Sequence, residues 1–398
     1  MNNPAPPPIA ATSSRDGDGE KPAKNPKLPL DPGGDAAEED DEEEKPRCEW
    51  DFTLSAVISS SPTPSAAPDA IGVVEFDPTG EFLATGGIAR KIRIYGTERS
   101  LRPSAALLDH ASACDFYLCT PAKLSSLKWR PGSGSRLLGS GDYDGVVTEY
   151  DLESRAPVFE RDEHGGRRVW SLDYHPGPPP LGASGSDDGT VQMWDPRCPD
   201  GGRCLPTVRP GRAGPSPVCC VEFDPCGGPL MAAGCTDRAI YMYDLRAISS
   251  GPTLVLDGHR GPVTYTRFLD FRTLVSSSVD GSLIMWSTEN GSPIRTFTGH
   301  ANSRRFVGLS VLRDAGLLSC GSENNRVFVY DKRWARPIWD REFHRMADEE
   351  QKGDGRDPDF VSGVCWRQMA GDGRCMLVAG GSDGVLQAFE GERKVMQV

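Results

Sequence analysis

The chain has 398 residues, a formal net charge of −13 and an ordinary hydrophobic fraction of 37%. Its 45 glycines and 34 prolines favour many short elements joined by turns over long helices. A chain of this acidity is not attracted over long range to nucleic acid or to an anionic membrane, so neither is expected as a partner.

Residues 1–46 are rich in proline, alanine, glycine and acidic residues. Twelve Asp and Glu stand there against five Lys and Arg, and large apolar side chains are almost absent. Nothing in such a segment offsets the entropy of ordering it. We therefore expect a disordered acidic tail, either solubilising or directed at a basic surface, followed by one folded domain over residues 47–398.

From residue 47 onward one pattern recurs seven times. Each copy has an apolar strand, a turn, a second apolar strand ending in small residues, a tight turn, and an alternating strand that ends in an aromatic residue. The copies lie at 75–95, 128–150, 173–194, 222–243, 267–286, 308–330 and 365–389. A small antiparallel sheet cannot bury both faces alone, so neighbouring sheets stack around an axis. The repeats predict an all-β, seven-bladed WD-repeat β-propeller.

The tight turn of each copy carries an Asp or Asn six residues before the closing aromatic, except for Ala89 in the first copy. These residues are Asp144, Asp188, Asp237, Asp280, Asn324 and Asp383. We expect the carboxylate to cap the turn and bind a histidine, which in turn reaches a hydroxyl and the indole below. The fifth copy offers His259, Ser277, Asp280 and Trp286, and the third offers His164, Ser184, Asp188 and Trp194. Both histidines are predicted to be structural.

The last copy ends near Phe389 and leaves few residues for a fourth strand. Residues 50–57, which precede the first copy, alternate as a strand does. We expect them to complete the seventh blade and close the ring, which removes an open sheet edge. A strand over 394–398 is the shorter alternative.

No catalytic or metal-binding motif stands out. The twelve cysteines include no C-x-x-C pair and no zinc spacing. Residues 380–384 fit the G-x-S-x-G pattern, but the residues that follow are strand-like, whereas a hydrolase nucleophile needs a strand-to-helix turn. We expect a protein that is not an enzyme and needs no cofactor or metal. The lack of a secretory signal and of a long apolar run predicts a reducing cytosolic or nuclear location.

Basic side chains gather in turns and interblade loops that lie on one face of a propeller. They are Arg90, Lys123, Arg167, Arg168, Arg238, Arg260, Arg304 and Arg305, with Tyr143, Trp170 and Phe306 beside them. Such a rim suits an extended acidic peptide with an apolar anchor. A solvated face of scattered charges is the alternative. The loop 198–217 and the acidic insert 340–359 are expected to be irregular solvated connections.

The body from Cys48 onward resembles the C-terminal propeller of the constitutively photomorphogenic ubiquitin ligase of plants. The match is carried by KLSSLKW (123–129), GDYDGVVTEYD (141–151), RVWSLDYH (168–175), GSDDGTVQMWD (185–195) and GHRGPV (258–263). The chain has no RING segment and no heptad stretch, which makes it similar to the propeller-only repressors of UV-B photomorphogenesis. That resemblance implies a nuclear and cytoplasmic protein that binds the UV-B photoreceptor, competes with the ligase for it and promotes its return to the inactive dimer.

In the ligase family the rim grips Val-Pro peptides. The resemblance places the following residues in that groove: Lys123, Tyr143, Arg168, Trp170 and Phe306. Arg238 and Arg260 join them as candidate partner-binding residues, and Arg238 stands where the family has a histidine. Gly261 replaces a family lysine, so the peptide preference is expected to differ.

Residues 194–197 form a W-D-x-R ending, which in WD proteins docks onto the adaptor of cullin-4 ubiquitin ligases. The candidate docking residues are Trp194, Asp195 and Arg197, and residues 243–246 and 330–333 are weaker versions. Because the Trp-Asp pair is also needed for the structure of such blades, only Arg197 carries information about docking. A substrate receptor that recruits transcription factors to such a ligase is therefore the alternative function, besides a general scaffold.

Overall fold

The computed structural model describes residues 48–60, 69–101, 107–178, 180–198, 205–343, 358–368 and 373–394. The acidic tail expected over residues 1–46 lies outside them. Within the described residues, no helix is long and apolar enough to cross a membrane.

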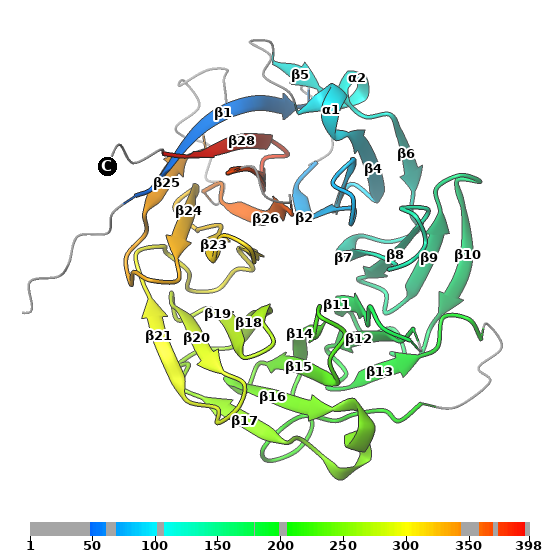
Figure 1. Cartoon of the computed structure of the whole chain (residues 1–398). Coiled ribbons are helices and arrows are strands. Elements are labelled where there is room, and N and C mark those ends of the chain that lie inside the picture. The colour runs from blue at the N-terminus through cyan, green and yellow to red at the C-terminus, as the bar shows by residue number, and fades with distance from the viewer. Residues whose placement is uncertain are drawn as a thin grey trace, which may run out of the picture. The chain divides into compact units, whose positions relative to one another are not determined.

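Seven sheets, antiparallel except for one short parallel pair in the seventh, stand around a central axis, which confirms the predicted seven-bladed propeller (Figure 1). Blade 1 contains β2 (Ile71–Phe76), β3 (Phe82–Gly87), β4 (Lys91–Gly96) and β6 (Phe116–Cys119). Blade 2 contains β7 (Leu124–Trp129), β8 (Leu137–Asp142), β9 (Val147–Asp151) and β10 (Ala156–Arg161). Blade 3 contains β11 (Val169–Tyr174), β12 (Gly182–Ser186) and β13 (Val191–Trp194). Blade 4 contains β14 (Val218–Phe223), β15 (Leu230–Cys235), β16 (Ala239–Asp244) and β17 (Leu254–Asp257), with the 3-10 helix η1 (Leu245–Ser250) between its last two strands.

The remaining three blades complete the ring. Blade 5 contains β18 (Val263–Asp270), β19 (Thr273–Ser278), β20 (Leu283–Ser287) and β21 (Pro293–Phe297). Blade 6 contains β22 (Leu309–Leu312), β23 (Leu317–Cys320), β24 (Arg326–Asp331) and β25 (Trp339–Glu342). Blade 7 contains β26 (Val361–Arg367), β27 (Arg374–Gly381), β28 (Leu386–Arg393) and β1 (Trp50–Ser59). In each blade the first of these strands lies innermost, and in blade 7 the outer strand β1 comes from the other end of the chain (Figure 1).

The hydrophobic core lies between the blades. One cluster joins Ile94 of blade 1 to Trp129 of blade 2, and another joins Met242 of blade 4 to Trp286 of blade 5. Each blade therefore buries its faces against its two neighbours, as the repeat pattern requires. The free energy gained by burying apolar side chains is therefore distributed over several clusters between blades, instead of coming from one central core.

One connection differs from the sequence-based expectation, whereas the loop 198–217 is irregular over its described residues, as expected. The insert 340–359 was expected to be irregular throughout, which is wrong for its first residues, because β25 pairs with β24 and sets Glu342 opposite Arg326. Alternating charges on an outer strand hide its pattern from a search for apolar strands. Blade 3 has no regular fourth strand among the described residues, and its outer edge is reached by a single bridge between Val191 and Val208.

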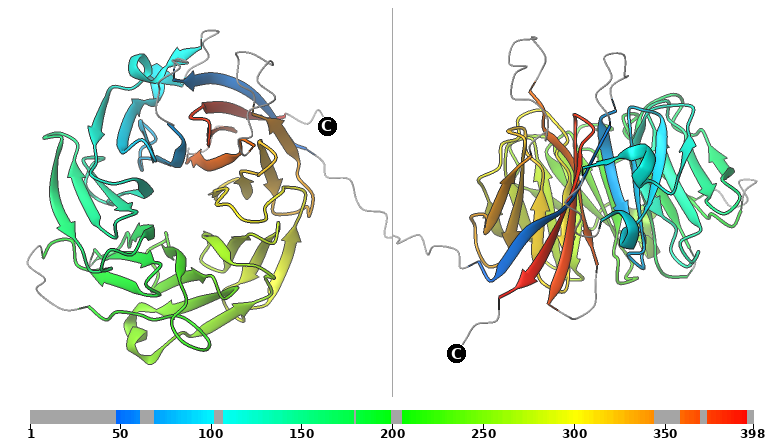
Figure 2. Two further views of the ribbon diagram at one scale, coloured as in Figure 1. Left: turned by 180° about the vertical axis from the view of Figure 1, so that it is seen from behind. Right: turned by 90° about the horizontal axis from the view of Figure 1, so that it is seen from above.

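Blade 7 is closed by strands from both ends of the described chain. β1 runs antiparallel to β28, from the pair Trp50 and Arg393 to the pair Ile58 and Leu386 (Figure 2). The segment between β4 and β6 then covers β1. It contains the helices α1 (Thr97–Ser100) and α2 (His110–Ala113) and the short strand β5 (Leu108–Asp109), which pairs in parallel with the end of β1. A fifth strand thus lies on the closing strand.

An ionic clasp holds the start of β1. The Glu49 carboxylate lies 3.0 Å from a guanidinium nitrogen of Arg333 in blade 6 and 3.0 Å from one of Arg393 at the end of β28. The hydrogen bond from Arg333, and after it the one from Arg393, holds the pKa of Glu49 below its ordinary value. Three segments distant in sequence therefore meet at one carboxylate.

Candidate peptide-binding face

The blade histidines are structural, as predicted, but one of their partners differs. His259 Nδ1 lies 3.0 Å from Asp280, and its Nε2 lies 2.7 Å from Ser276 Oγ. Trp286 Nε1 donates to the same hydroxyl over 2.8 Å. Ser277, named from the sequence, is therefore wrong by one residue. Successive side chains of a strand point to opposite faces, and only Ser276 faces the histidine.

Blade 3 has part of the predicted set, with His164 between Asp188 at 2.9 Å and Ser184 at 2.7 Å. Trp194 is the exception, because its Nε1 is buried without a hydrogen-bond partner. These arrangements look like a Ser-His-Asp relay, but His164 and Ser184 are buried inside the blade and so are closed to a substrate. Blades 1 and 6 use a tyrosine instead, in the pairs Tyr95 with His110 and Tyr330 with His300.

The turn-capping carboxylates follow the expected position in four blades. Asp188, Asp237, Asp280 and Asp383 each accept a hydrogen bond from the main chain two residues later. Blade 2 departs from this rule. There Asp142 accepts from the main-chain N–H groups of Asp144 and Val146, so Asp142 is the capping residue.

A β-bulge recurs near the start of the innermost strand in six blades. A bulge adds one residue and re-aims its side chain. The added residue is small in five blades, where it is Gly72, Ser125, Cys219, Thr264 or Ser362. In blade 3 it is Trp170, whose large ring therefore projects at the mouth of the central channel. We call the face that carries these bulges, and the turns between the second and third strands, the upper face.

Trp170 is the centre of an aromatic cluster on the upper face. Its ring stacks on that of Phe306, with centroids 4.3 Å apart and planes 5° from parallel. The Arg168 guanidinium lies 4.5 Å from the Trp170 ring and 4.1 Å from the Tyr143 ring. Tyr265 meets Phe306 edge-on at 5.8 Å. Blades 3 and 6 lie across the ring from each other, so the stack spans the mouth of the channel (Figure 1).

Two acidic residues hold the stacked rings in place. Trp170 Nε1 donates to Asp187 over 2.6 Å. On the other side, the Glu323 carboxylate accepts from the main-chain N–H groups of Arg304 and Arg305, both over 2.9 Å. Those bonds fix the loop that presents Phe306. The cluster is therefore rigid before any partner arrives, which lowers the entropy lost on binding.

The structure brings four of the seven predicted groove residues together, namely Tyr143, Arg168, Trp170 and Phe306. Lys123 is exposed and joins them through its carbonyl, which accepts from Tyr143 N over 2.9 Å. Arg238 and Arg260 are exposed on blade 4 and on the loop before blade 5, and no contact in the described part of the chain links them to the cluster. Sequence reasoning missed Tyr265, Asp187 and Glu323. The strand alternation of residues 263–268 could have pointed to Tyr265.

Gly261, which replaces the family lysine, is tightly packed. A Cβ atom there would lie 2.8 Å from Val279 Cγ2 and 3.1 Å from the main-chain nitrogen of Asp280. A side chain at this position would push against the turn between β19 and β20.

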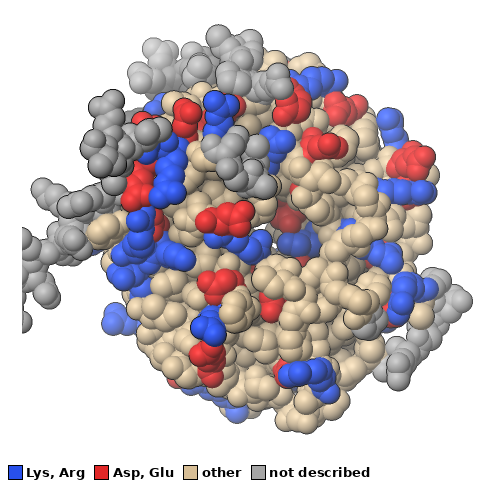
Figure 3. Space-filling model, in the orientation of Figure 1, with Lys and Arg blue, Asp and Glu red and all other residues tan. Residues whose placement is uncertain are grey.

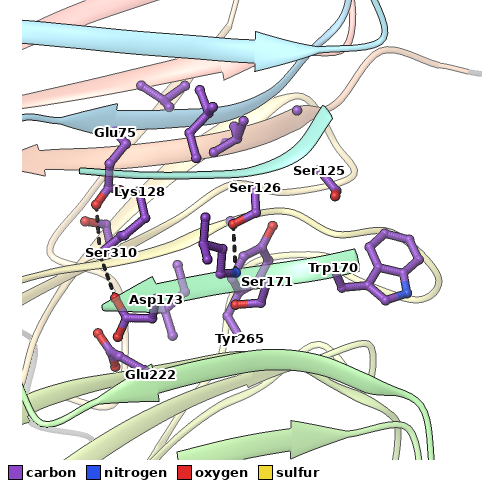
Figure 4. A pocket seen from close by; sticks show the side chains of 18 of the residues that line it. Glu75, Ser125, Ser126, Lys128, Trp170, Ser171, Asp173, Glu222, Tyr265 and Ser310 are labelled. Atoms are coloured by element: carbon purple, nitrogen blue, oxygen red, sulfur yellow. Dashed lines mark hydrogen bonds and ion pairs between the residues drawn. The ribbon is translucent and has the colours of Figure 1, made fainter. Parts of the chain in front are cut away.

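Below the aromatic stack, the central channel forms a polar cavity of about 60 Å³. Trp170 lies at one end, and Glu75, Lys128, Asp173 and Glu222 lie toward the other (Figure 4). Lys128 is 2.9 Å from Glu75 and 3.6 Å from Asp173. Burial raises the pKa of Glu222 to about 7, although Arg267 and Arg313 oppose that shift. Because acids and bases alternate here, the cavity is balanced in charge and serves to tie neighbouring blades together.

The lower face carries the three segments in which D-x-R follows an aromatic residue, at 194–197, 243–246 and 330–333. Arg197 grips the Asp195 carboxylate with Nε at 2.9 Å and Nη2 at 2.6 Å, and this pairing lowers the pKa of Asp195 to about 2. Arg246 binds Asp244 in the same way. Arg333 also binds Asp331, but its contact with Glu49 makes it part of the ring closure. Of these three arginines, only Arg197 in blade 3 and Arg246 in blade 4 therefore take no part in closing the ring.

The G-x-S-x-G pattern lies in the turn between β27 and β28. Asp383 caps that turn, and Ser382 Oγ accepts from Phe360 N over 3.0 Å. Among the described residues there is no group of His, Cys, Asp or Glu that could hold a metal ion. One face of the propeller shows basic and acidic side chains interleaved, with basic ones gathered beside blades 6 and 7 (Figure 3).

Two plant proteins align with most of the chain. The WD repeat-containing protein RUP2 of Arabidopsis thaliana is 56% identical over 336 residues, which cover 82% of this chain and 89% of that protein. The WD repeat-containing protein RUP1 of the same plant is 57% identical over 351 residues, covering 87% and 86%. The chain belongs to the RUP1 and RUP2 family.

The chain is also similar to longer proteins. The Arabidopsis E3 ubiquitin-protein ligase COP1 is 34% identical over 312 residues, which cover 78% of this chain but only 43% of that protein. This confirms the relationship inferred from the motifs. The WD domain, G-beta repeat profile matches residues 155–195. The profile of the Nucleolar protein 10-like N-terminal domain matches residues 178–332, less than half of the chain.

Proposed function

We propose that this member of the RUP1 and RUP2 family is a non-enzymatic negative regulator of UV-B signalling, active in nucleus and cytoplasm. It binds the UV-B photoreceptor, promotes its return to the inactive dimer and competes with the photomorphogenic E3 ligase for it. The observation that carries the proposal is the prearranged cluster of Tyr143, Arg168, Trp170 and Phe306 on a propeller similar to that of COP1.

The cluster suits an extended peptide with an apolar anchor and acidic neighbours. Stacked aromatic rings offer a rigid apolar surface, which is the usual centre of a binding hot spot. Arg168 is held between two rings and has a buried Nε without a hydrogen-bond partner. That nitrogen is closed to a partner, but Arg168 as a whole is only half-buried, so a carboxylate can meet the accessible part of its side chain. Exposed Lys123 adds a second cation nearby.

The regulatory part of the proposal is tested by re-dimerisation. Purified photoreceptor is converted to monomer with UV-B and then kept in the dark with or without this protein. We expect the photoreceptor to return to the dimer faster when the protein is present. Size-exclusion chromatography measures the monomer and dimer over time. An unchanged rate would overturn this role.

The groove is tested by peptide binding. A Val-Pro peptide from the photoreceptor should bind Trp170→Ala at least about tenfold more weakly, because a hot-spot ring is lost. Lys123→Glu should also weaken binding through charge repulsion. Phe271→Ala is a matched control, since Phe271 is 59% exposed in the turn between β18 and β19 on the lower face. Equal affinity of wild type and Trp170→Ala would exclude this groove.

A second candidate function is a substrate receptor of a cullin-4 ligase that recruits transcription factors. It is favoured by the pair of half-buried Asp195 and exposed Arg197 after Trp194 at the end of blade 3. We expect Arg197→Ala to reduce co-purification with the ligase adaptor, whereas Arg272→Ala, another exposed arginine on the lower face, should not. Full co-purification of Arg197→Ala would count against docking through this segment.

A further inference from the structure

The lower ends of blades 6 and 7 gather cations around the point where the described chain begins. Blades 2 to 5 each hold a lower-face arginine against a carboxylate of the same blade, as Asp244 holds Arg246. In blades 6 and 7 basic side chains cluster instead (Figure 3). Five exposed cations, from the loop after β24 and from the end of β28, form what we call the basic corner: Lys332, Arg333, Arg336, Arg393 and Lys394.

The carboxylates of the basic corner are fewer than its cations. Arg333 binds both Glu49 and buried Asp331, and Glu49 is shared with a second arginine of the corner. The third carboxylate, Asp51, lies 3.0 Å from Lys394. Five cations therefore meet three carboxylates, which leaves this corner positive on a chain whose net charge is −13.

Lys332 supplies a cation that no carboxylate neutralises. None of the described residues forms an ion pair with its ammonium group. Its main-chain nitrogen donates to the Gly316 carbonyl over 3.0 Å, and a Cβ atom on Gly316 would lie 2.9 Å from Lys332 Cδ. The stem of the lysine is thus packed on the turn between β22 and β23. A packed stem has less rotamer freedom to lose when the ammonium group binds an anion.

The loop that carries three of the five cations is ordered before any partner arrives. Arg333 N donates to the Asp331 carboxylate over 2.8 Å, and Trp334 N donates to the Asp331 carbonyl over 2.9 Å. At the other end, Arg336 Nη1 donates to Thr298 Oγ1 over 3.3 Å. Half-buried Trp334 lies between the cations and adds apolar contact area. A rigid surface of arginine and tryptophan is typical of protein-binding hot spots.

The surroundings of the corner favour a short acidic segment over a long polyanion. At physiological salt the attraction of a small positive patch extends only about 8 Å, the Debye length. A nucleic acid would run beyond the corner onto the exposed acids that flank it, such as Asp340 and Glu392, and onto a chain that is acidic as a whole. A peptide with a few Asp or Glu residues ends within the corner.

We infer that the basic corner is a docking surface for an acidic segment of a partner protein, separate from the aromatic cluster of the upper face. The corner joins the loop after β24 to the end of β28 and the start of β1, so a bound segment spans the place where the ring closes. A ligand that binds the folded ring and not the unfolded chain stabilises the ring. Docking should therefore also tighten blade 7.

Binding is tested by fluorescence anisotropy with two labelled peptides, one with eight glutamates between glycines and the other with glutamines in their place. Wild type should bind the glutamate peptide more tightly. The double variant Lys332→Gln, Lys394→Gln should bind it about fivefold more weakly, as for the loss of two exposed ion pairs. Neither lysine contacts Glu49 among the described residues, so the clasp at β1 is kept. Melting temperatures check that the fold is unchanged.

The matched control is Arg246→Gln, Arg272→Gln, which removes two exposed cations from the lower face in blades 4 and 5. It should bind the glutamate peptide as wild type does. Equal affinity of wild type for the two peptides, or an equal loss in the control, would overturn the inference. A labelled DNA octanucleotide is the third ligand. If it binds more tightly than the glutamate peptide and the lysine variant weakens it, the corner is a nucleic-acid site and the inference fails.

Hydrogen exchange locates the bound segment. The glutamate peptide at saturation should slow amide exchange in β1 and β28, both in wild type and in Trp170→Ala, because the upper-face cluster takes no part. The lysine variant should show less slowing at the same peptide concentration. Slowing confined to the strands beside Trp170, with none in β1, would place the peptide on the upper face and exclude the basic corner.

Discussion

A single hydroxyl group can connect several buried side chains within one blade. Ser276 Oγ is shared by His259 and Trp286, whereas the adjacent Ser277 Oγ is buried without a hydrogen-bond partner. The two serines differ by one position on the same strand, so they form a natural pair for comparison.

We expect Ser276→Ala to lower the free energy of unfolding by about 2–3 kcal/mol, because two buried ring nitrogens lose their partner. Ser277→Ala should cause no loss, since it removes a polar atom that is already unsatisfied. Urea unfolding of both variants measures the difference. A loss of the same size in Ser277→Ala would show that the hydroxyl partner has been assigned to the wrong residue.

For single residues, the sequence predicts which residue types form the site better than it predicts their hydrogen-bond partners. The aromatic and basic residues of the upper face were found because their turn and loop positions repeat from blade to blade. Ser277 was wrong because the strand pleat exchanges faces at every residue, so a one-residue error in register selects the opposite side. Trp170 was predicted to be on the rim, but its reach over the channel depends on a bulge that strand alternation does not reveal.

Among the elements, Glu49 links the closing strand β1 to the turn after β24 and to the end of β28. The carboxylate joins Arg333, Arg393 and the closing strand β1, and its pKa is held low by these contacts. A carboxyl group with a lowered pKa contributes stability above its unfolded pKa, and that contribution is lost as the pH falls through the lower folded value.

We therefore expect Glu49→Gln to increase amide hydrogen exchange in β1 at neutral pH, with a loss of about 0.5–1 kcal/mol in local opening free energy. The difference from wild type should shrink as the pH falls through the lowered pKa of Glu49, which lies below the ordinary value of 4.5. Glu392→Gln is the control, because its partner Arg374 lies 3.8 Å away and both side chains are mostly exposed. Unchanged exchange in β1 would exclude the clasp.

Regular strands could be predicted because their apolar alternation is local. Strands of the outer edge were harder, since they meet solvent and carry charge. β25 has only one half-buried aromatic residue among charged neighbours, and it forms because Arg326 of β24 faces Asp340 and Glu342. The helices and β5 beside the closing strand were not predicted, because they are short and depend on contacts with blade 7.

For the whole molecule, the charged channel couples stability to pH. Burial raises the pKa of Glu222 to about 7, against the attraction of Arg267 and Arg313 and with the repulsion of Asp173. Between the ordinary pKa near 4.5 and about 7, the folded chain holds a proton at this site that the unfolded chain has released. Folding is thus favoured by this group at low pH, and the contribution is lost as the pH rises through that window.

Glu222→Gln removes this dependence. Relative to wild type, the variant should gain stability as the pH rises from 5 to 8, by an amount of up to about 3 kcal/mol. The other titrating groups are common to both proteins, so the difference between their melting temperatures across the pH range isolates Glu222. A constant difference would mean that Glu222 titrates at its ordinary pKa.

The way the ring closes also determines how it responds to force. Trp50 pairs with Arg393, and Lys394 N donates to the Glu49 carbonyl over 2.8 Å, so both described chain ends leave blade 7 at the same corner. A pull applied to these two ends separates β1 from β28 like a zipper, loading one pair of hydrogen bonds at a time instead of all together. The closed ring therefore stabilises the propeller against heat, whereas tension on the two ends opens it where β1 pairs with β28. An unfolding motor that grips both ends would open blade 7 first.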